Sequence, residues 1–302
     1  MPELALYSDR LFMAAVGVYV LAMVLHAAEF AAVRSAKAVL VGAGGSDHDG
    51  AAARPRSERF ARMAVSLTVL GAVLHAGSII LRGLAAQRWP LGNMYEFTSA
   101  VCLAAVVAWL VMLRRSPASR SVGPFVLLPV VVLLFLAGTV LYARAAPVQP
   151  ALQSYWLVIH VTTITISSGL LLVPGVASIL FLLRRSGRLP AGLARLLPSS
   201  DVLDRLAYRT TIIAFPLFTF AVIAGAIWAE AAWGRFWGWD PKETVAFVSW
   251  VIYAAYLHAR ATAGWRAARA AWINVAGFAT VLFNLFFINM VVAGLHSYAG
   301  LG

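Results

Sequence analysis

The stretch Trp233–Glu243 reads WGRFWGWDPKE and lies between two hydrophobic segments of the chain. Four aromatic residues fall within seven of its positions, namely Trp233, Phe236, Trp237 and Trp239. Two glycines and the Asp240-Pro241 step predict an irregular loop rather than the interior of a helix. One interpretation is an aromatic belt, because tryptophan gathers at membrane interfaces. The other is a surface for a large, flat, apolar ligand with anionic groups, because Arg235 and Lys242 lie among the tryptophans.

The composition is that of a membrane protein. Hydrophobic residues make up 62% of the 302 positions and charged residues 12%, and the mean hydropathy is +0.83. These values are typical of a polytopic membrane protein and exclude a soluble domain. The single cysteine, Cys102, lies in an apolar run, so the chain cannot form its own disulfide or a CxxC redox pair. Any thiol chemistry therefore requires a partner protein.

Eight apolar runs, each about 17–25 residues long, are long enough to cross a bilayer as helices. They cover residues 11–33, 61–82, 94–113, 122–142, 156–183, 210–229, 244–259 and 271–292. The sequence therefore predicts an all-α, polytopic membrane helix bundle of about eight transmembrane helices, with a single domain over residues 1–302. The first run is itself long enough to span, so no cleavable signal is expected.

The basic residues lie mainly in alternate connections between these runs. Eighteen of the 24 Lys and Arg residues lie at 34–62, 114–120, 184–209 and 260–269, and six lie on the opposite side. The positive-inside rule places the richer side in the cytoplasm. We therefore expect both termini and the Trp-rich loop, residues 228–243, to be extracytoplasmic. The net charge of +12 is then an orientation signal, and nucleic acid is not an expected partner.

The histidines are the only candidate soft metal ligands. No HExxH motif or clustered His/Cys spacing supports a zinc site. His160 begins the fifth run and His296 follows the eighth, so the topology puts both on the side of the Trp-rich loop. Each is an interfacial hydrogen-bonding residue or a metal ligand, and spacing cannot show whether they face each other. His258 lies inside the seventh run, about 21 Å from its start, and an ionisable residue within a span is a candidate functional residue.

The segment WGRFWGWDPKETVAFVSWVIYAAYLHAR resembles the tryptophan-rich WWD signature of haem-handling membrane proteins. The most similar family is the CcsA (ResC-like) family of cytochrome c biogenesis. The DPKET continuation and the downstream YLHAR separate the sequence from the related CcmC type. Val245 departs from the family pattern, which usually has another Trp there. One aromatic side chain of the expected ligand site is therefore in doubt.

The resemblance implies ligands for haem b. The contexts SYWLVIHV of His160 and GLHSY of His296 are similar to those of two external haem-ligating histidines, so the two would form an axial pair. The YLHAR context of His258 is similar to that of an intramembrane histidine that binds haem on entry. The second ligand there is open between His26, His75 and a histidine of a partner subunit, and we favour the partner.

Further residues would shape the same site. The tryptophans Trp233, Trp237 and Trp239 would cover one porphyrin face. Arg235 and Lys242 are candidate partners of the propionates, and Asp240 would cap and shape the loop. The segment RWPLGNMYEFTS, residues 88–99, resembles the short PxxNxYE segment of the family. Its Asn93, Tyr95 and Glu96 either shape the cavity or cap the third helix, and we favour the structural role.

The function implied is haem delivery to apocytochrome c and covalent attachment at a reduced CxxCH segment. The chain would be the haem-presenting subunit of a system II cytochrome c synthase (haem lyase) in the bacterial cytoplasmic membrane. Its partners would be a CcsB (ResB-like) membrane subunit, the apocytochrome and, indirectly, thiol-reducing proteins. Two alternatives are a haem-b electron-transfer membrane subunit and a transporter of a non-haem solute. The transporter predicts broken helices near the membrane midplane, for which only Pro174 and Pro216 are candidates.

Overall fold

The computed structural model describes residues 2–42, 47–147, 154–194, 197–262 and 268–296. Within these ranges the regular secondary structure is helical and no strand occurs. The long helices are α1 (Pro2–Gly42), α2 (Asp47–Ala86), α3 (Met94–Arg115), α4 (Gly123–Thr139), α5 (Tyr155–Arg185), α7 (Ser200–Trp233), α8 (Pro241–Ala261) and α9 (Ala268–Phe283). The shorter elements are η1 (Pro117–Val122), α6 (Ala191–Ala194), a π-helical turn η3 (Asn284–Ile288) and α10 (Asn289–Val291).

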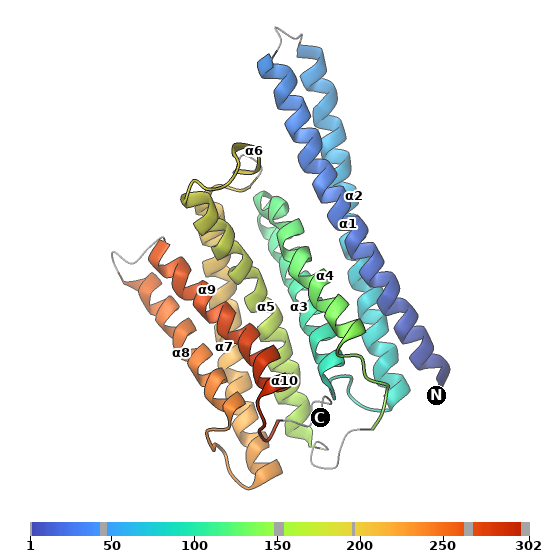
Figure 1. The fold of residues 1–302 in the computed structure, drawn as a ribbon, viewed down its shortest axis with the longest axis vertical. Coiled ribbons are helices and arrows are strands. Elements are labelled where there is room, and N and C mark those ends of the chain that lie inside the picture. Colours follow the sequence, from blue (N-terminus) through green and yellow to red (C-terminus); the bar gives the residue numbers. More distant parts are fainter. Residues whose placement is uncertain (1, 43–46, 148–153, 195–196, 263–267, 297–302) are drawn as a thin grey trace.

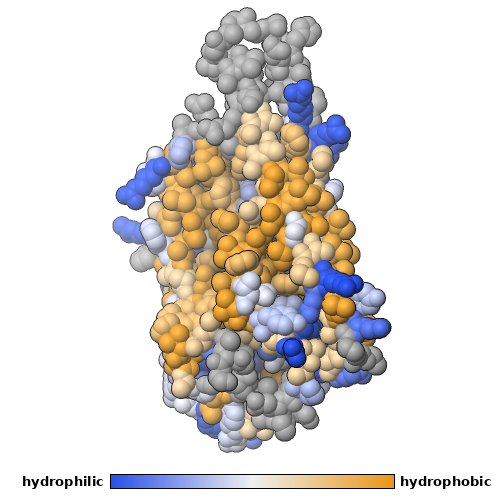
Figure 2. Space-filling view, turned by 45° about the vertical axis from the view of Figure 1, so that its right-hand side comes forward, coloured by the Kyte–Doolittle hydropathy of each residue, from blue (hydrophilic) through white to orange (hydrophobic). Residues whose placement is uncertain are grey.

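The predicted membrane bundle is confirmed. Each of the eight predicted runs overlaps one of the long helices, the eighth continuing through η3 and α10, and within the described ranges seven helices are long and apolar enough to cross a membrane. The remaining helix, α8, is less apolar because it carries Lys242, Glu243, His258 and Arg260. Figure 2 shows a broad apolar surface between hydrophilic residues at the two ends of the molecule, as expected of a multi-pass membrane protein.

The helices pack as two neighbouring groups (Figure 1). Helices α1 and α2 form a long hairpin that contacts α3 and α4, whereas α5 packs on α7 and α9, and α8 packs on α7 and α9. The contact of α3 with α5 joins the two groups. The start of α1, the α7–α8 connection and α10 all lie at the same end of the bundle (Figure 1).

Local sequence signals determine where the Trp-rich connection begins and ends. Helix α7 ends at Gly234, whose φ of 72° lies in the left-handed region that glycine tolerates. Helix α8 starts with Asp240 as its N-cap and Pro241 in its first turn, and Glu243 completes a capping box. The irregular backbone thus covers residues 234–240, which is shorter than the predicted loop of residues 228–243, because α7 continues through Trp233.

Cys102 is fully buried in α3. Its Sγ lies 3.8 Å from the carbonyl oxygen of Val130 on α4, among the apolar side chains of the core. A thiol in this position is not accessible to another protein.

Candidate functional site

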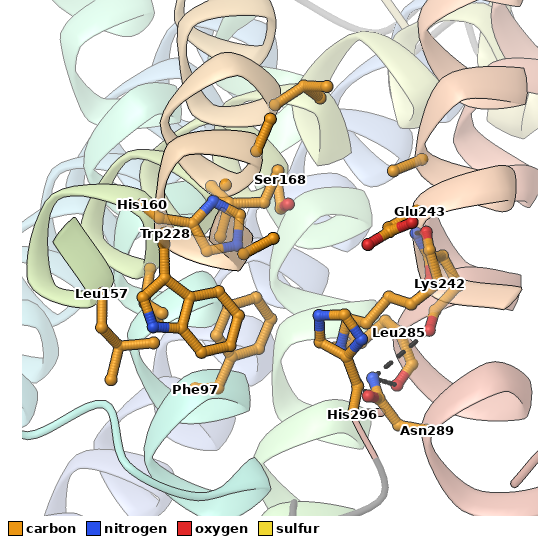
Figure 3. Close-up of a pocket in the computed structure, with 18 of the residues that line it drawn as sticks. Phe97, Leu157, His160, Ser168, Trp228, Lys242, Glu243, Leu285, Asn289 and His296 are labelled. Carbon is orange, nitrogen blue, oxygen red and sulfur yellow. Dashed lines mark hydrogen bonds between the residues drawn. The ribbon is translucent and has the colours of Figure 1, made fainter. Parts of the chain in front are cut away.

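A cavity lies at the end of the bundle that carries the α7–α8 connection (Figure 3). Its empty volume is about 1300 Å³, part of which is open solvent. Its walls come from the N-terminal ends of α3 and α5, the C-terminal half of α7, the start of α8 and the end of α9 with η3. His160 and His296, which the sequence places 136 positions apart, both line it.

His160 is held against α7 by a hydrogen bond from its Nδ1. Nδ1 lies 2.8 Å from the carbonyl oxygen of Ala221, and because that oxygen can only accept, Nδ1 carries the proton. Gly225 makes room for the ring, since a Cβ at that position would lie 2.7 Å from the imidazole. The ring also stacks on Trp228, with centroids 6.0 Å apart and an interplanar angle of 6°. This arrangement leaves Nε2 as the nitrogen through which His160 could bind a metal.

His296 is oriented by Asp240. Its Nδ1 lies 2.9 Å from Oδ2 of Asp240, and the backbone N–H of Leu295 donates to Oδ1 of the same carboxylate at 2.8 Å. Burial would raise the pKa of Asp240, but the hydrogen bond from His296 and those from backbone N–H groups hold it at about 2. Burial lowers the pKa of His296 despite that carboxylate. At neutral pH the pair is therefore a carboxylate and a neutral imidazole with its proton on Nδ1.

The two histidines share the pattern seen around metal-bound imidazoles. A ligating histidine usually donates its other ring N–H to a carboxylate or a backbone carbonyl, which fixes the tautomer and the ring orientation. His160 donates to a carbonyl and His296 to a carboxylate. Asp240 thus has a role beyond the helix cap that the sequence indicated.

Trp228 is a site residue that the sequence analysis missed. Its ring centroid lies 6.0 Å from those of both His160 and His296, and 4.8 Å from that of Trp233. Trp233 in turn lies 5.1 Å from His296. The spacing carries a signal, because Trp228 lies within two helical turns of Trp233, but the apolar run that contains Trp228 indicates a membrane span rather than part of the aromatic cluster.

The predicted tryptophans divide into two groups. Trp233 and Trp237 line the cavity, whereas the structure does not bring Trp239 into its wall. Trp239 is 64% exposed and packs edge-on against Trp237 and Phe247. Its φ of 57° is rare for a bulky residue, and such a conformation costs about 1–3 kcal/mol. The Trp-rich connection therefore presents one aromatic surface to the cavity and a second one outward.

Arg235 and Lys242 have different surroundings. The Arg235 guanidinium pairs with the Glu243 carboxylate at 3.1 Å and lies 5.8 Å from the Trp233 ring. Glu243 also accepts from the backbone N–H groups of Gly238 and Asp240, so this ion pair fastens the loop. Lys242 lines the cavity together with Glu243, and Arg235 does not.

The third predicted ligand, His258, lies away from this cavity. It is exposed on α8, one turn before the end of that helix. His26 is fully buried beside Glu29 and Trp109, and His75 is fully buried between Tyr19 and Ser99. Helices α1 and α2, which carry them, lie on the other side of the bundle from α8 (Figure 1). The structure thus brings neither His26 nor His75 to His258.

The segment before α3 forms another wall of the cavity. Asn93 caps α3 by accepting from the Glu96 N–H at 2.9 Å, and Leu91 to Met94 line the cavity. Glu96 is buried and binds Arg82 at 3.2 Å and Arg88 at 2.7 Å. Tyr95 is buried below the Arg82 guanidinium. These contacts agree with the structural role that we favoured for the segment.

The chemistry of the walls suits haem as a substrate. Two imidazoles with engaged Nδ1–H groups lie among flat aromatic side chains, as bis-histidine ligation requires. No group of three or more His, Cys, Asp or Glu side chains that could hold a metal occurs within the described ranges.

Comparison with known proteins shows the family of this chain. A family model described as "Cytochrome C assembly protein" matches residues 91–296, which include every residue of the cavity wall. The cytochrome c biogenesis protein CcsA of Synechococcus sp. (strain RCC307) is 34% identical over 271 residues, which cover 81% of this chain and 86% of that protein. CcsA of Prochlorococcus marinus (strain MIT 9313) is 36% identical over 263 residues, with 77% and 82% covered.

The fold also resembles that of a solved structure, the cytochrome c haem lyase CcmF. The TM-score is 0.64 at 18% sequence identity, and the match covers 94% of this chain but 46% of the CcmF chain. The present chain thus spans about half the length of that protein, and the likeness shows a shared fold. With the family model and the CcsA relatives together, the chain belongs to the CcsA family of cytochrome c assembly proteins.

Proposed function

We propose that this chain presents haem b for covalent attachment to apocytochrome c, as the haem-presenting subunit of a cytochrome c synthase. Membership of the CcsA family supports a role in cytochrome c assembly in general. One observation supports the more specific proposal that the chain presents haem. His160 and His296 line the same cavity, and each has its Nδ1–H engaged by an acceptor, which is the usual arrangement of a metal-ligating imidazole.

In this proposal the residues of the chain bind and orient the substrate. His160 and His296 would hold the iron, Trp228, Trp233 and Trp237 would pack against the porphyrin, and Asp240 would keep His296 in the ligating tautomer. The bound haem supplies two vinyl groups, to which the two thiols of a CxxCH segment add. Each addition forms a C–S bond and transfers the thiol hydrogen to the vinyl group, so no external oxidant or reductant is needed. The chain contributes positioning and exclusion of water rather than a nucleophile.

The proposal includes partners and an orientation. The exposed position of His258 on α8 supports pairing with a histidine of a ResB-like (CcsB) subunit. The buried position of Cys102 supports a dependence on separate thiol-reducing proteins that keep the CxxCH cysteines reduced. The distribution of basic residues supports insertion in the bacterial cytoplasmic membrane with the cavity on the extracytoplasmic side.

The test is chemical rescue of a missing ligand. His160→Gly and His296→Gly, each expressed with a ResB-like partner and a reporter cytochrome, should lose cytochrome maturation. Imidazole added to the medium should partly restore it, because it can occupy the vacated coordination position. A purified sample should show a low-spin bis-imidazole absorption spectrum, and the Gly variants should regain it with imidazole.

Trp237→Ala is the control. It removes aromatic area from the cavity without removing a ligand, so haem retention should weaken and imidazole should have no effect. If both Gly variants keep haem and maturation, the external bis-histidine site is wrong. If the purified protein carries no haem absorbance under any condition, the transporter alternative gains support over both haem functions.

A further inference from the structure

Lys242 is a cavity-lining lysine that forms no salt bridge among the described residues, while the Asp240 carboxylate is near enough to favour its charged form. It is the second residue of α8, and its side chain points along the cavity wall (Figure 3). Its Nζ donates to Oδ1 of Asn289 at 2.5 Å. The two adjacent acids are engaged elsewhere, Asp240 with His296 and Glu243 with Arg235. Within the described ranges Lys242 forms no ion pair, and a partly buried cation of this kind favours an anion beside it.

The π-helical turn η3 positions the partner of this cation, Asn289, which is the first residue of α10. Because a π-turn bonds residue i to residue i+5, it brings residues five positions apart onto one face. Asn284 and Asn289 are such a pair, and both line the cavity. The Asn289 side-chain N–H₂ donates to the carbonyl oxygens of Leu285 at 2.7 Å and Asn284 at 3.3 Å. The turn thus fixes the Asn289 amide so that its oxygen faces Lys242.

Asn284 contacts the same residue from the other side. Its Nδ2 donates to the backbone carbonyl oxygen of Lys242 at 3.3 Å. Its Oδ1 is buried and has no hydrogen-bond partner among the residues that the structure describes. A buried amide oxygen of this kind needs a donor, which a protonated carboxyl group or a water molecule can supply.

The cavity is polar on one side and apolar on the other. Lys242, Asn289 and His296 lie on the side of α8 and η3, whereas Phe97, Leu157 and Trp228 lie on the opposite side (Figure 3). An amphiphilic flat ligand is oriented by such a difference, because its charged edge is favoured beside the cation and its apolar edge beside the aromatic wall. Arg235 does not compete for the charged edge, since Glu243 already holds it.

We propose that Lys242, whose ammonium group is held by the Asn289 amide oxygen, forms a carboxylate subsite that takes a propionate group of haem. This inference rests on the proposed function, because it takes haem as the ligand of the cavity. The porphyrin carries its propionates and its vinyl groups on different edges. A subsite for the propionates beside η3 therefore selects which edge is offered for thioether formation.

The test compares haem with its dimethyl ester, in which both propionates are esterified. Purified full-length protein in detergent is titrated with each compound, and the ratio of the two dissociation constants is measured. Wild type should bind the free acid about tenfold more tightly, the factor expected for one hydrogen bond to a charged group. Lys242→Met and Asn289→Leu should bring the ratio close to one, and Lys242→Arg should largely restore it. Arg235→Met is the matched control and should keep the wild-type ratio.

The absorption spectrum separates failure of this inference from failure of the proposed function. An unchanged ratio in Lys242→Met, with bis-imidazole spectra for both compounds, would overturn the subsite and leave the histidine site standing. The same conclusion follows if Arg235→Met and not Lys242→Met removes the preference. If wild type gives no bis-imidazole spectrum with either compound, both proposals are wrong. Binding of the ester by each variant serves as the check that it is folded.

Discussion

The carboxylate of Asp240 links the start of α8 to His296, with Nδ1 of the imidazole 2.9 Å from Oδ2. The same carboxylate caps α8 and accepts from the Leu295 N–H. One side chain thus joins the Trp-rich connection to the segment that carries an expected haem ligand. This link positions His296, which follows α10 and does not lie on a described helix.

Asp240→Asn should therefore weaken haem binding without unfolding the loop. Asparagine is as good an N-cap as aspartate, so α8 should keep its start. The charge that favours the ligating tautomer is lost, and changes of this kind reduce metal affinity by about 10–100-fold. The measurement is the haem dissociation constant, with the melting temperature of the haem-free protein as the check on folding. Wild-type affinity in this variant would limit Asp240 to helix capping.

Gly225→Ala should displace His160. A Cβ at this position would lie 2.7 Å from the imidazole, so the ring has to move from the Ala221 carbonyl. Alanine in a helix is favoured over glycine by about 1 kcal/mol, so a loss of haem should not be explained by a weaker helix. Gly17→Ala is the matched control, because a Cβ there meets nothing within 4 Å. Equal haem content in the two variants would show that the packing around His160 tolerates the added methyl group.

The sequence predicted the spans and both cavity histidines, but not how the site is assembled. Span length and apolar content are local properties, so all eight runs were found on helices. The part played by Trp228 depends on which face of α7 meets α5, and the link between Asp240 and His296 joins residues 56 positions apart. Spacing places Trp228 near Trp233 along α7, but neither of these contacts between elements follows from it. The pairing of Arg235 with Glu243 likewise depends on a loop conformation that includes Trp239 in the left-handed region.

His258→Ala should lower haem content only in the presence of the ResB-like subunit. The residue is exposed on α8 and has neither His26 nor His75 nearby, so we expect a second ligand from another chain. The measurement is haem per protein for the variant and wild type, each purified alone and as the complex. A loss of the same size without the partner would contradict a shared site. No loss in the complex would remove His258 from the expected ligands.

Reporter fusions test the orientation. A reporter that is active only outside the cytoplasm should be active when fused after Gly302, and one that needs the cytoplasm should be active at Arg266. Both sites fall outside the described ranges, so the expectation comes from the distribution of basic residues alone. The reverse pattern would place the cavity on the cytoplasmic side and would contradict attachment to an exported cytochrome.

Glu96→Gln should destabilise the cavity wall far more than a comparable change at an exposed ion pair. The side chains of Glu96 and Arg82 are 1% and 2% exposed, and Arg88 shares the same carboxylate. Removal of one partner from a buried pair costs about 3–5 kcal/mol, and the only ion pair that Arg82 would keep among the described residues is the longer one with Asp9, at 3.5 Å. The Gly92 N–H, which donates to Glu96, should be released as well. Because Leu91 to Met94 line the cavity, haem retention should fall together with the melting temperature.

Glu58→Gln is the control for that loss. Glu58 pairs with Arg120, but its side chain is 57% exposed and Arg120 keeps a second partner in Glu29. An exposed pair of this kind contributes less than about 1 kcal/mol, so the melting temperature and haem retention should stay close to wild type. Both variants replace a carboxylate that pairs with arginine by an amide. The difference between their melting temperatures therefore reports the effect of burying the ion pair. Equal shifts in melting temperature would mean that the Glu96 cluster is hydrated in the membrane and does not hold the wall in place.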